Sequence, residues 1–128
     1  MRKKLTFVAL LLFSSLAAAA GDYDGIWALD VPANADYFSI HQQSNIMVVA
    51  NLDNSLDGGG WDAYKGVLNG DTVVADLLVS TESGGRISIQ IIFASPSHAT
   101  VKMIACIPDK GTLCPWPVGT QYSMIRVF

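Results

Sequence analysis

The stretch Asp53-Asn54-Ser55-Leu56-Asp57-Gly58 places oxygen-bearing side chains at alternate positions before a glycine. This spacing is typical of the first half of a calcium-binding loop. The second half departs from that pattern, because Tyr64 stands where the bidentate glutamate belongs and no helical pattern flanks the segment. A hairpin tip rich in Asp, Asn and Gly explains the same residues without a metal. We therefore expect no metal site, and the remaining calcium candidates are Asp53, Ser55, Asp57 and Asp62.

Three aromatic residues are candidates for binding a ligand. In Cys114-Pro115-Trp116-Pro117 the two prolines hold an indole in an extended segment of low conformational entropy. Such an indole is suited to stack on a sugar or a ring, or to enter an apolar pocket of a partner protein. The alternative is that Trp116 folds back as a lid over the core. Trp61 and Tyr64 have the same two interpretations.

The candidate catalytic residues form no recognisable signature. The two histidines are His41 and His98, and no serine or cysteine spacing marks either as a catalytic base. Four carboxylates on different elements are formal candidates for glycosidase chemistry, namely Asp30, Asp62, Asp76 and Glu82. Only Asp76 lies inside an apolar run, from Val73 to Val79, where burial would raise its pKa. We expect a protein that is not an enzyme and uses no cofactor.

Residues 1–20 have the form of an export signal. Arg2–Lys4 give a positive start, Leu5–Leu16 an apolar segment too short to span a bilayer, and Ala18 and Ala20 a cleavage pattern. Cleavage after Ala20 leaves 128 − 20 = 108 residues, enough for one domain over 21–128. We expect a periplasmic or secreted protein that does not insert into the membrane after cleavage.

The charge of the processed chain excludes some partners. Removing the three basic residues of the leader leaves 8 − 3 = 5 basic against 11 acidic residues, a net charge near 5 − 11 = −6. No basic cluster is available to neutralise phosphates, so neither nucleic acid nor anionic lipid is expected to bind. The expected partner is an unknown small molecule or a protein.

Cys106 and Cys114 are the two cysteines of the chain. In an oxidising compartment such a pair is usually a disulfide, and two thiols without a nearby histidine make a poor zinc site. We therefore predict a Cys106–Cys114 disulfide.

The elements that position these residues are predicted to be strands. Apolar residues recur with a period of two, and Gly, Asn, Asp and Pro separate short runs, including Asn69-Gly70, a type I′ turn signal. Eight closely spaced strands form an antiparallel meander, which can close into a small barrel or split into two packed sheets. We favour the barrel. The strands are Gly25–Leu29, Tyr37–Gln43, Ile46–Leu52, Trp61–Leu68, Thr72–Ser80, Ile87–Ala94, Thr100–Ile107 and Gln121–Phe128.

Several segments resemble a known group of proteins. The run GIWALDVPANADYFSIHQQSNIMVV resembles the opening of a family of small secreted proteobacterial β-domains without an assigned function. IIFASPSHATVKM and YSMIRVF resemble its penultimate hairpin and its closing strand. Two departures are the residues 34–37, where glycines are usual, and the insertion from Cys106 to Cys114.

A looser similarity links the chain to lipocalins and related calycin barrels, which begin with Gly-x-Trp and place an arginine of the last strand over that Trp. This resemblance implies structural roles for Gly25, Trp27 and Arg126, with a cation–π contact between Trp27 and Arg126 closing one end of the barrel. Gly25 lies on the same strand face as Trp27, where a glycine permits close approach of a neighbour.

These features together favour an exported, non-enzymatic β-domain. It would bind a small ligand or a sugar at the barrel mouth or loop tips, near Trp61, Tyr64 and Trp116. The alternative is a protein-interaction module, such as an inhibitor or an assembly subunit, that uses the apolar final strands and the Trp116 loop. A hydrolase dependent on Asp76 or His41 is the third interpretation.

Overall fold

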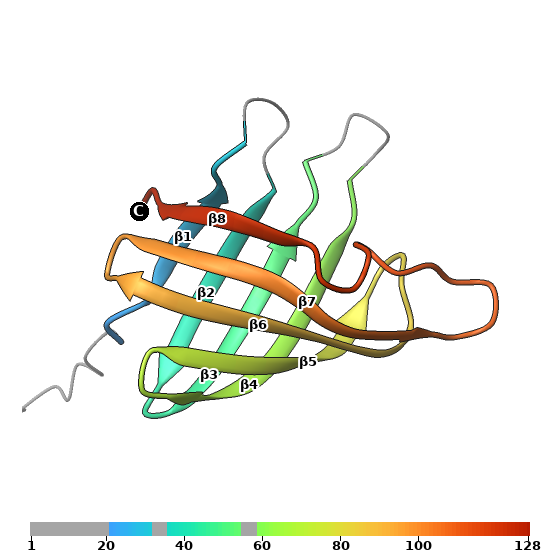
Figure 1. Cartoon of the computed structure of the whole chain (residues 1–128), viewed down its shortest axis with the longest axis horizontal. Helices are drawn as coiled ribbons and strands as arrows, with labels where there is room; N and C mark the ends of the chain where they lie inside the picture. Colours follow the sequence, from blue (N-terminus) through green and yellow to red (C-terminus); the bar gives the residue numbers. More distant parts are fainter. Residues whose placement is uncertain (1–20, 32–35, 55–58) are drawn as a thin grey trace, which may run out of the picture.

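The computed structural model describes residues 21–31, 36–54 and 59–128, which form an all-β closed barrel (Figure 1). Each strand pairs antiparallel with the next, and β1 pairs with β8 to close the sheet. The predicted antiparallel meander and its closure into a barrel are therefore confirmed. The strands are β1 Gly25–Leu29, β2 Tyr37–Gln43, β3 Ile46–Leu52, β4 Trp61–Asn69, β5 Thr72–Ser80, β6 Gly85–Ser95, β7 His98–Pro108 and β8 Gln121–Arg126.

The strand bounds differ from the prediction mainly in the β6–β7 hairpin. This ladder runs from Gly85↔Pro108 to Ser95↔His98, so both strands are longer than expected. The last strand ends earlier, at Arg126. The two final residues nevertheless stay beside β1, because the N–H of Val127 donates to the carbonyl of Ile26 at 2.8 Å.

Side chains of alternate residues fill the barrel interior. The period of two directs one face of each strand inward, and an eight-stranded barrel has an interior that side chains just fill. These inward side chains form one continuous apolar core. Its largest fully buried members are Trp27, Phe38, Met47, Ile87, Ile89, Ile91, Met103 and Met124.

One end of the barrel, here called the turn end, carries three two-residue connections: 44–45, 70–71 and 96–97. The predicted I′ turn is shifted by one residue, because Asn69 pairs with Thr72 and leaves Gly70 and Asp71 as the central residues. Of these two central residues only Gly70 has a positive φ, 64°. A positive φ at the first central residue alone is the pattern of a type II′ turn and not of a type I′ turn.

The opposite end, here called the loop end, carries the longer connections 30–36, 53–60, 81–84 and 109–120. The predicted disulfide is confirmed there, because Cys106 of β7 is bonded to Cys114 with the Cα atoms 6.0 Å apart. β5 and β6 diverge near this end, since their ladder stops at Asp76↔Ser88. The loop end is therefore the less regular part of the barrel.

Candidate functional site

A pocket of about 110 Å³ lies at the loop end, between the connections that precede β2, β4 and β6 and the segment after the disulfide. Four carboxylate side chains line it: Asp36, Asp53, Asp62 and Glu82. The amide of Asn51 and the indoles of Trp61 and Trp116 line it as well. Among the described residues that line the pocket none is basic, so its walls carry an excess of negative charge.

The strand register brings the inner wall of the pocket together. Asn51 of β3 lies opposite Asp62 of β4, and both occupy inward positions where apolar residues would be expected. Their exposed fractions are 5% and 8%. Asp53 follows β3, and its N–H donates to the carbonyl of Gly60 at 2.9 Å, which closes the base of the β3–β4 connection. Two buried polar side chains therefore face the pocket from the rim of the core.

Asp36 is held among acceptors and donors at this rim. Burial is the main effect that raises the pKa of its carboxyl above the ordinary value, and the negative charge of Asp53 raises it further. The backbone N–H of Asn54 and the side-chain amide of Asn51 donate to this carboxylate and act in the opposite direction. Protonation of Asp36 therefore removes the free-energy cost of burying its charge and its repulsion from Asp53.

Asn51 is left with an unused acceptor. Its amide nitrogen is directed to Asp36, while its Oδ1 is buried and has no hydrogen-bond partner within the described part of the chain. A buried polar atom without a partner costs free energy, about 1–3 kcal/mol. A donor brought within hydrogen-bond distance of this oxygen would remove that cost.

Tyr64 lies beneath the pocket and not at its surface. The side chain is 2% exposed, and its hydroxyl donates to the carboxylate of Asp62. Burial first, and the negative charge of Asp62 second, raise the pKa of Tyr64 above its ordinary value. Of the three predicted ligand-binding aromatics, Tyr64 can therefore act only by positioning Asp62.

Trp116 packs over the loop end of the core. Its ring lies 6.1 Å from that of Phe38 and 5.4 Å from that of Tyr122, the latter in an edge-on arrangement. The disulfide and Pro115 hold the segment in place. This packing matches the interpretation of Trp116 as a lid, and the same indole also lines the pocket.

Trp61 contributes the exposed side of the pocket, with an exposed fraction of 44%. Its backbone is fixed to the β5–β6 connection, because its N–H donates to Oγ1 of Thr81 at 2.9 Å and its carbonyl accepts from the N–H of Thr81 at 3.0 Å. The segment of Trp61 is thus fixed by its two hydrogen bonds to Thr81, and the segment of Trp116 by the disulfide.

The calcium candidates are brought together only in part. Asp53 and Asp62 both line the pocket, whereas Ser55 and Asp57 lie outside the described residues. Within residues 21–31, 36–54 and 59–128, no group of three or more His, Cys, Asp or Glu side chains is arranged to hold a metal ion. The acidic pocket therefore offers charge without a metal-ligand cluster in that part of the chain.

The other catalytic candidates lie away from the pocket. Asp76 is exposed on the outer face of β5 and accepts a hydrogen bond from Ser88, so the expectation that Asp76 is buried is wrong. Strand parity explains this, because Val73 and Ala75 are the inward neighbours. His41 is exposed at the turn end, and His98 begins β7 with Nδ1 2.9 Å from Oγ of Ser97.

The sequence interpretation missed two residues of the pocket, Asp36 and Asn51. Asn51 could have been found from the alternation of β3, since Met47 and Val49 before it point inward and Asn51 continues that face. Asp36 had the same signal in β2, because Phe38 and Ile40 point inward and Asp36, directly before the strand, continues that face. Glu82 was considered only as one of four carboxylates for hydrolysis, and it shares the pocket with Asp62 but not with Asp30 or Asp76.

The predicted structural residues meet at the turn end. Gly25 permits close approach, because a Cβ there would lie 2.1 Å from the carbonyl oxygen of Phe128. Trp27 pairs in register with Arg126, but no cation–π contact joins them in the described part of the barrel. The guanidinium of Arg126 instead donates to the carbonyls of Asp22 at 3.1 Å, Phe128 at 3.3 Å and Pro96 at 3.4 Å.

Two structural findings bear on where the protein is found. No helix in the described residues is long and apolar enough to cross a membrane. The disulfide is of a kind that persists in oxidising compartments. No family model matches the chain, and neither does any curated protein or any solved structure.

Proposed function

We propose that the protein is an exported, non-enzymatic binding protein that holds a small ligand at the loop end of the barrel. The observation that carries this proposal is the polar pocket lined by four carboxylates, where the lining residue Asn51 has a buried Oδ1 without a partner among the described residues. A native structure rarely leaves a buried acceptor unpaired, so the atom points to a donor supplied from outside.

The filled interior supports the loop end as the binding place. Large side chains such as Phe38, Met47 and Met103 occupy the centre of the barrel and are fully buried. A ligand inside the barrel would have to displace them, at a cost of several kcal/mol in lost packing. The pocket at the loop end needs no such displacement.

The chemistry of the pocket favours a ligand that carries a protonated amine. Four carboxylates and the free oxygen of Asn51 are acceptors, and a primary ammonium supplies three donors with a positive charge. The indoles of Trp61 and Trp116 favour a cation further, because an ammonium is attracted to an aromatic face. The volume, about 110 Å³, suits an amine head group and not a whole drug-sized molecule, for which pockets of about 300–1,000 Å³ are typical.

The test is a titration of the ¹⁵N-labelled protein lacking residues 1–20 with D-glucosamine and with D-glucose, followed by NMR. These two sugars differ in one group, an ammonium against a hydroxyl, and therefore separate an amine site from a sugar site. We expect glucosamine to shift the indole N–H signals of Trp61 and Trp116 but not that of Trp27, which lies buried at the turn end. Equal binding of both sugars would assign the pocket to the sugar ring instead, and no shift with either would refute the proposal.

Matched variants locate the binding. Glu82→Gln removes one charge from the pocket, and we expect it to weaken glucosamine binding several-fold. Asp71→Asn removes one charge from the turn end, where Asp71 accepts a hydrogen bond from Thr72, and we expect it to leave binding unchanged. Equal affinity of the two variants would show that the net charge, and not the pocket, attracts the ligand.

A second candidate function is that of a protein-interaction module. The observation that favours it is the apolar surface around the disulfide, where Leu113 is 81% exposed and Ile107 and Val118 are each 58% exposed. Immobilised protein would be used to capture partners from the exported fraction of the source cells. Capture that is abolished by Leu113→Ser but unaffected by Glu82→Gln would support this function over ligand binding.

A further inference from the structure

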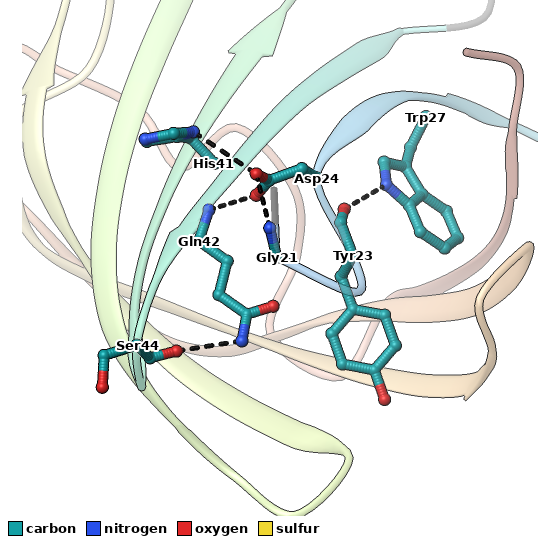
Figure 2. Close-up of polar contacts among 7 residues, drawn as sticks. All are labelled: Gly21, Tyr23, Asp24, Trp27, His41, Gln42 and Ser44. Atoms are coloured by element: carbon teal, nitrogen blue, oxygen red, sulfur yellow. Dashed lines mark hydrogen bonds and ion pairs between the residues drawn. The ribbon is translucent and has the colours of Figure 1, made fainter. Parts of the chain in front are cut away.

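Residues 21–24 fold across the turn end of the barrel, where nitrogens of Gly21 and of β2 surround the carboxylate of Asp24 (Figure 2). The backbone N–H of Gly21 donates to Oδ2 of Asp24 at 2.8 Å, and the N–H of Gln42 donates to Oδ1. Nδ1 of His41 lies 3.7 Å from Oδ2. The Asp24 side chain is only 15% exposed, whereas that of His41 is 75% exposed. A largely buried carboxylate therefore accepts the hydrogen bond from the N–H of Gly21.

Gly21 is fitted closely against the side chain of Gln42. A Cβ built on Gly21 would lie 2.5 Å from the Cβ of Gln42 and 2.7 Å from its Oε1, so no larger residue fits without movement. The Nε2 of Gln42 donates to the carbonyl of Ser44 at 2.9 Å, which orients the amide. Its Oε1 is buried and has no partner within the described residues. Both a carboxylate and an unpaired acceptor thus lie beside Gly21.

We propose that this place is a receptor for the chain's own N-terminus, created when the leader is removed between Ala20 and Gly21. A peptidase would add water across that peptide bond, giving a carboxylate on Ala20 and an ammonium on Gly21. Before cleavage the nitrogen of Gly21 has one hydrogen and no charge. Afterwards it has three hydrogens and a positive charge, enough to keep the bond to Asp24 and to supply a donor to Oε1 of Gln42.

The segment that carries this nitrogen also covers the core. The ring of Tyr23 stacks on that of Phe93 with the centroids 3.8 Å apart. The carbonyl of Tyr23 accepts a hydrogen bond from Nε1 of Trp27 at 3.1 Å (Figure 2). The carbonyl of Asp22 accepts from Nη1 of Arg126 at 3.1 Å. An ammonium bound to Asp24 therefore fixes a segment that joins β1, β6 and β8. Leader removal stabilises the folded barrel, and the uncleaved chain is the less stable form.

The charged groups around the new ammonium are known from the structure. Asp24 faces it directly, and His41, which is a cation only when protonated, lies beside the same carboxylate. Arg126 approaches the backbone of Asp22 from the other side. Since Asp24 is the nearest of these groups, its negative charge outweighs the others and favours the protonated amine.

The experiment compares three forms of the protein: one starting at Gly21, the same chain with an acetylated N-terminus, and a chain that keeps Ala20. We expect the free N-terminus to raise the melting temperature by about 4 °C or more over both other forms. Asp24→Asn should abolish the difference between the free and the acetylated form, whereas Asp71→Asn, at an exposed site, should preserve it. Equal melting temperatures of these three forms, without any substitution, would overturn the proposal.

A second measurement does not depend on a variant that folds. In the unsubstituted protein with a ¹⁵N-labelled Gly21, NMR titration gives the pKa of the amine directly. We expect it about one unit above the ordinary value of about 7.7–8.0, a tenfold preference for the protonated form. An unshifted value, or an exported protein whose N-terminal residue is not Gly21, would refute the ion pair.

Discussion

Replacing Gly25 with alanine tests whether the closure between β1 and β8 needs a residue without a side chain. Gly25 has a φ of 144°, in a region that L residues rarely adopt. An added Cβ would lie 2.1 Å from the carbonyl oxygen of Phe128 and 2.9 Å from Nε of Arg126. The first of these contacts is with backbone, so the C-terminal segment would have to move away from β1.

The cost follows from the hydrogen bonds that this movement breaks. The N–H of Ile26 donates to Phe128 at 2.9 Å, the N–H of Val127 donates to Ile26 at 2.8 Å, and Nε of Arg126 donates to Phe128 at 3.3 Å. At about 1 kcal/mol each, the three bonds contribute about 3 kcal/mol. Backbone strain adds about 1–2 kcal/mol. We therefore expect Gly25→Ala to lower the free energy of unfolding by about 4–5 kcal/mol, against a typical total of about 5–15 kcal/mol.

Equilibrium unfolding in urea measures this loss, and Gly111→Ala provides the control. Gly111 also has a positive φ, 87°, but a Cβ there would meet nothing within 4 Å. The control variant therefore reports the strain alone. If both variants lose the same free energy, the close approach of Phe128 does not determine stability, and the reasoning is refuted.

Three further predictions concern the loop end. Because burial raises the pKa of Asp36, ionisation of this carboxyl destabilises the fold at neutral pH. In urea titrations Asp36→Asn should therefore raise the free energy of unfolding at pH 7, and the gain should disappear below pH 3.8. A lower free energy of unfolding at pH 7 would contradict this prediction. Tyr64→Phe should lower the unfolding free energy by about 1–2 kcal/mol, since the buried carboxylate of Asp62 loses its donor, and an unchanged urea midpoint would be inconsistent with that bond. Replacing Cys106 and Cys114 with serine should lower the free energy of unfolding by about 2–3 kcal/mol at most, because the loop that the disulfide closes is short. Loss of the folded far-ultraviolet circular dichroism spectrum would show that the disulfide does more than restrict the unfolded chain.

The architecture was predictable because short strands with a period of two leave few alternatives. Tight turns at 44–45 and 96–97 force neighbouring strands to pair, and an antiparallel meander of that length can close on itself. The extension of β6 to Gly85 was not predictable, because it depends on partners in β7 near the disulfide and not on the residues of β6 themselves.

The candidate site was predictable only where a strand dictates it. Trp61 and Trp116 were identified from their residue types, and the structure places both on one pocket. Asp76 was misjudged because β5 is apolar on both faces, so that Val74 and Leu78 on the outer side hide the alternation. Asp36 was missed because it lies just outside the predicted strand, although it continues the inward face of Phe38 and Ile40.

The pairing of β1 with β8 also determines the order in which the fold can be completed. All other pairs join consecutive strands, whereas this one joins the two ends of the chain and includes Trp27↔Arg126. A chain that folds from its N-terminus can build the meander strand by strand, but it can close the sheet only after the last strand is available. A chain that stops before Gln121 would expose the free edges of β1 and β7, and unpaired strand edges are templates for aggregation.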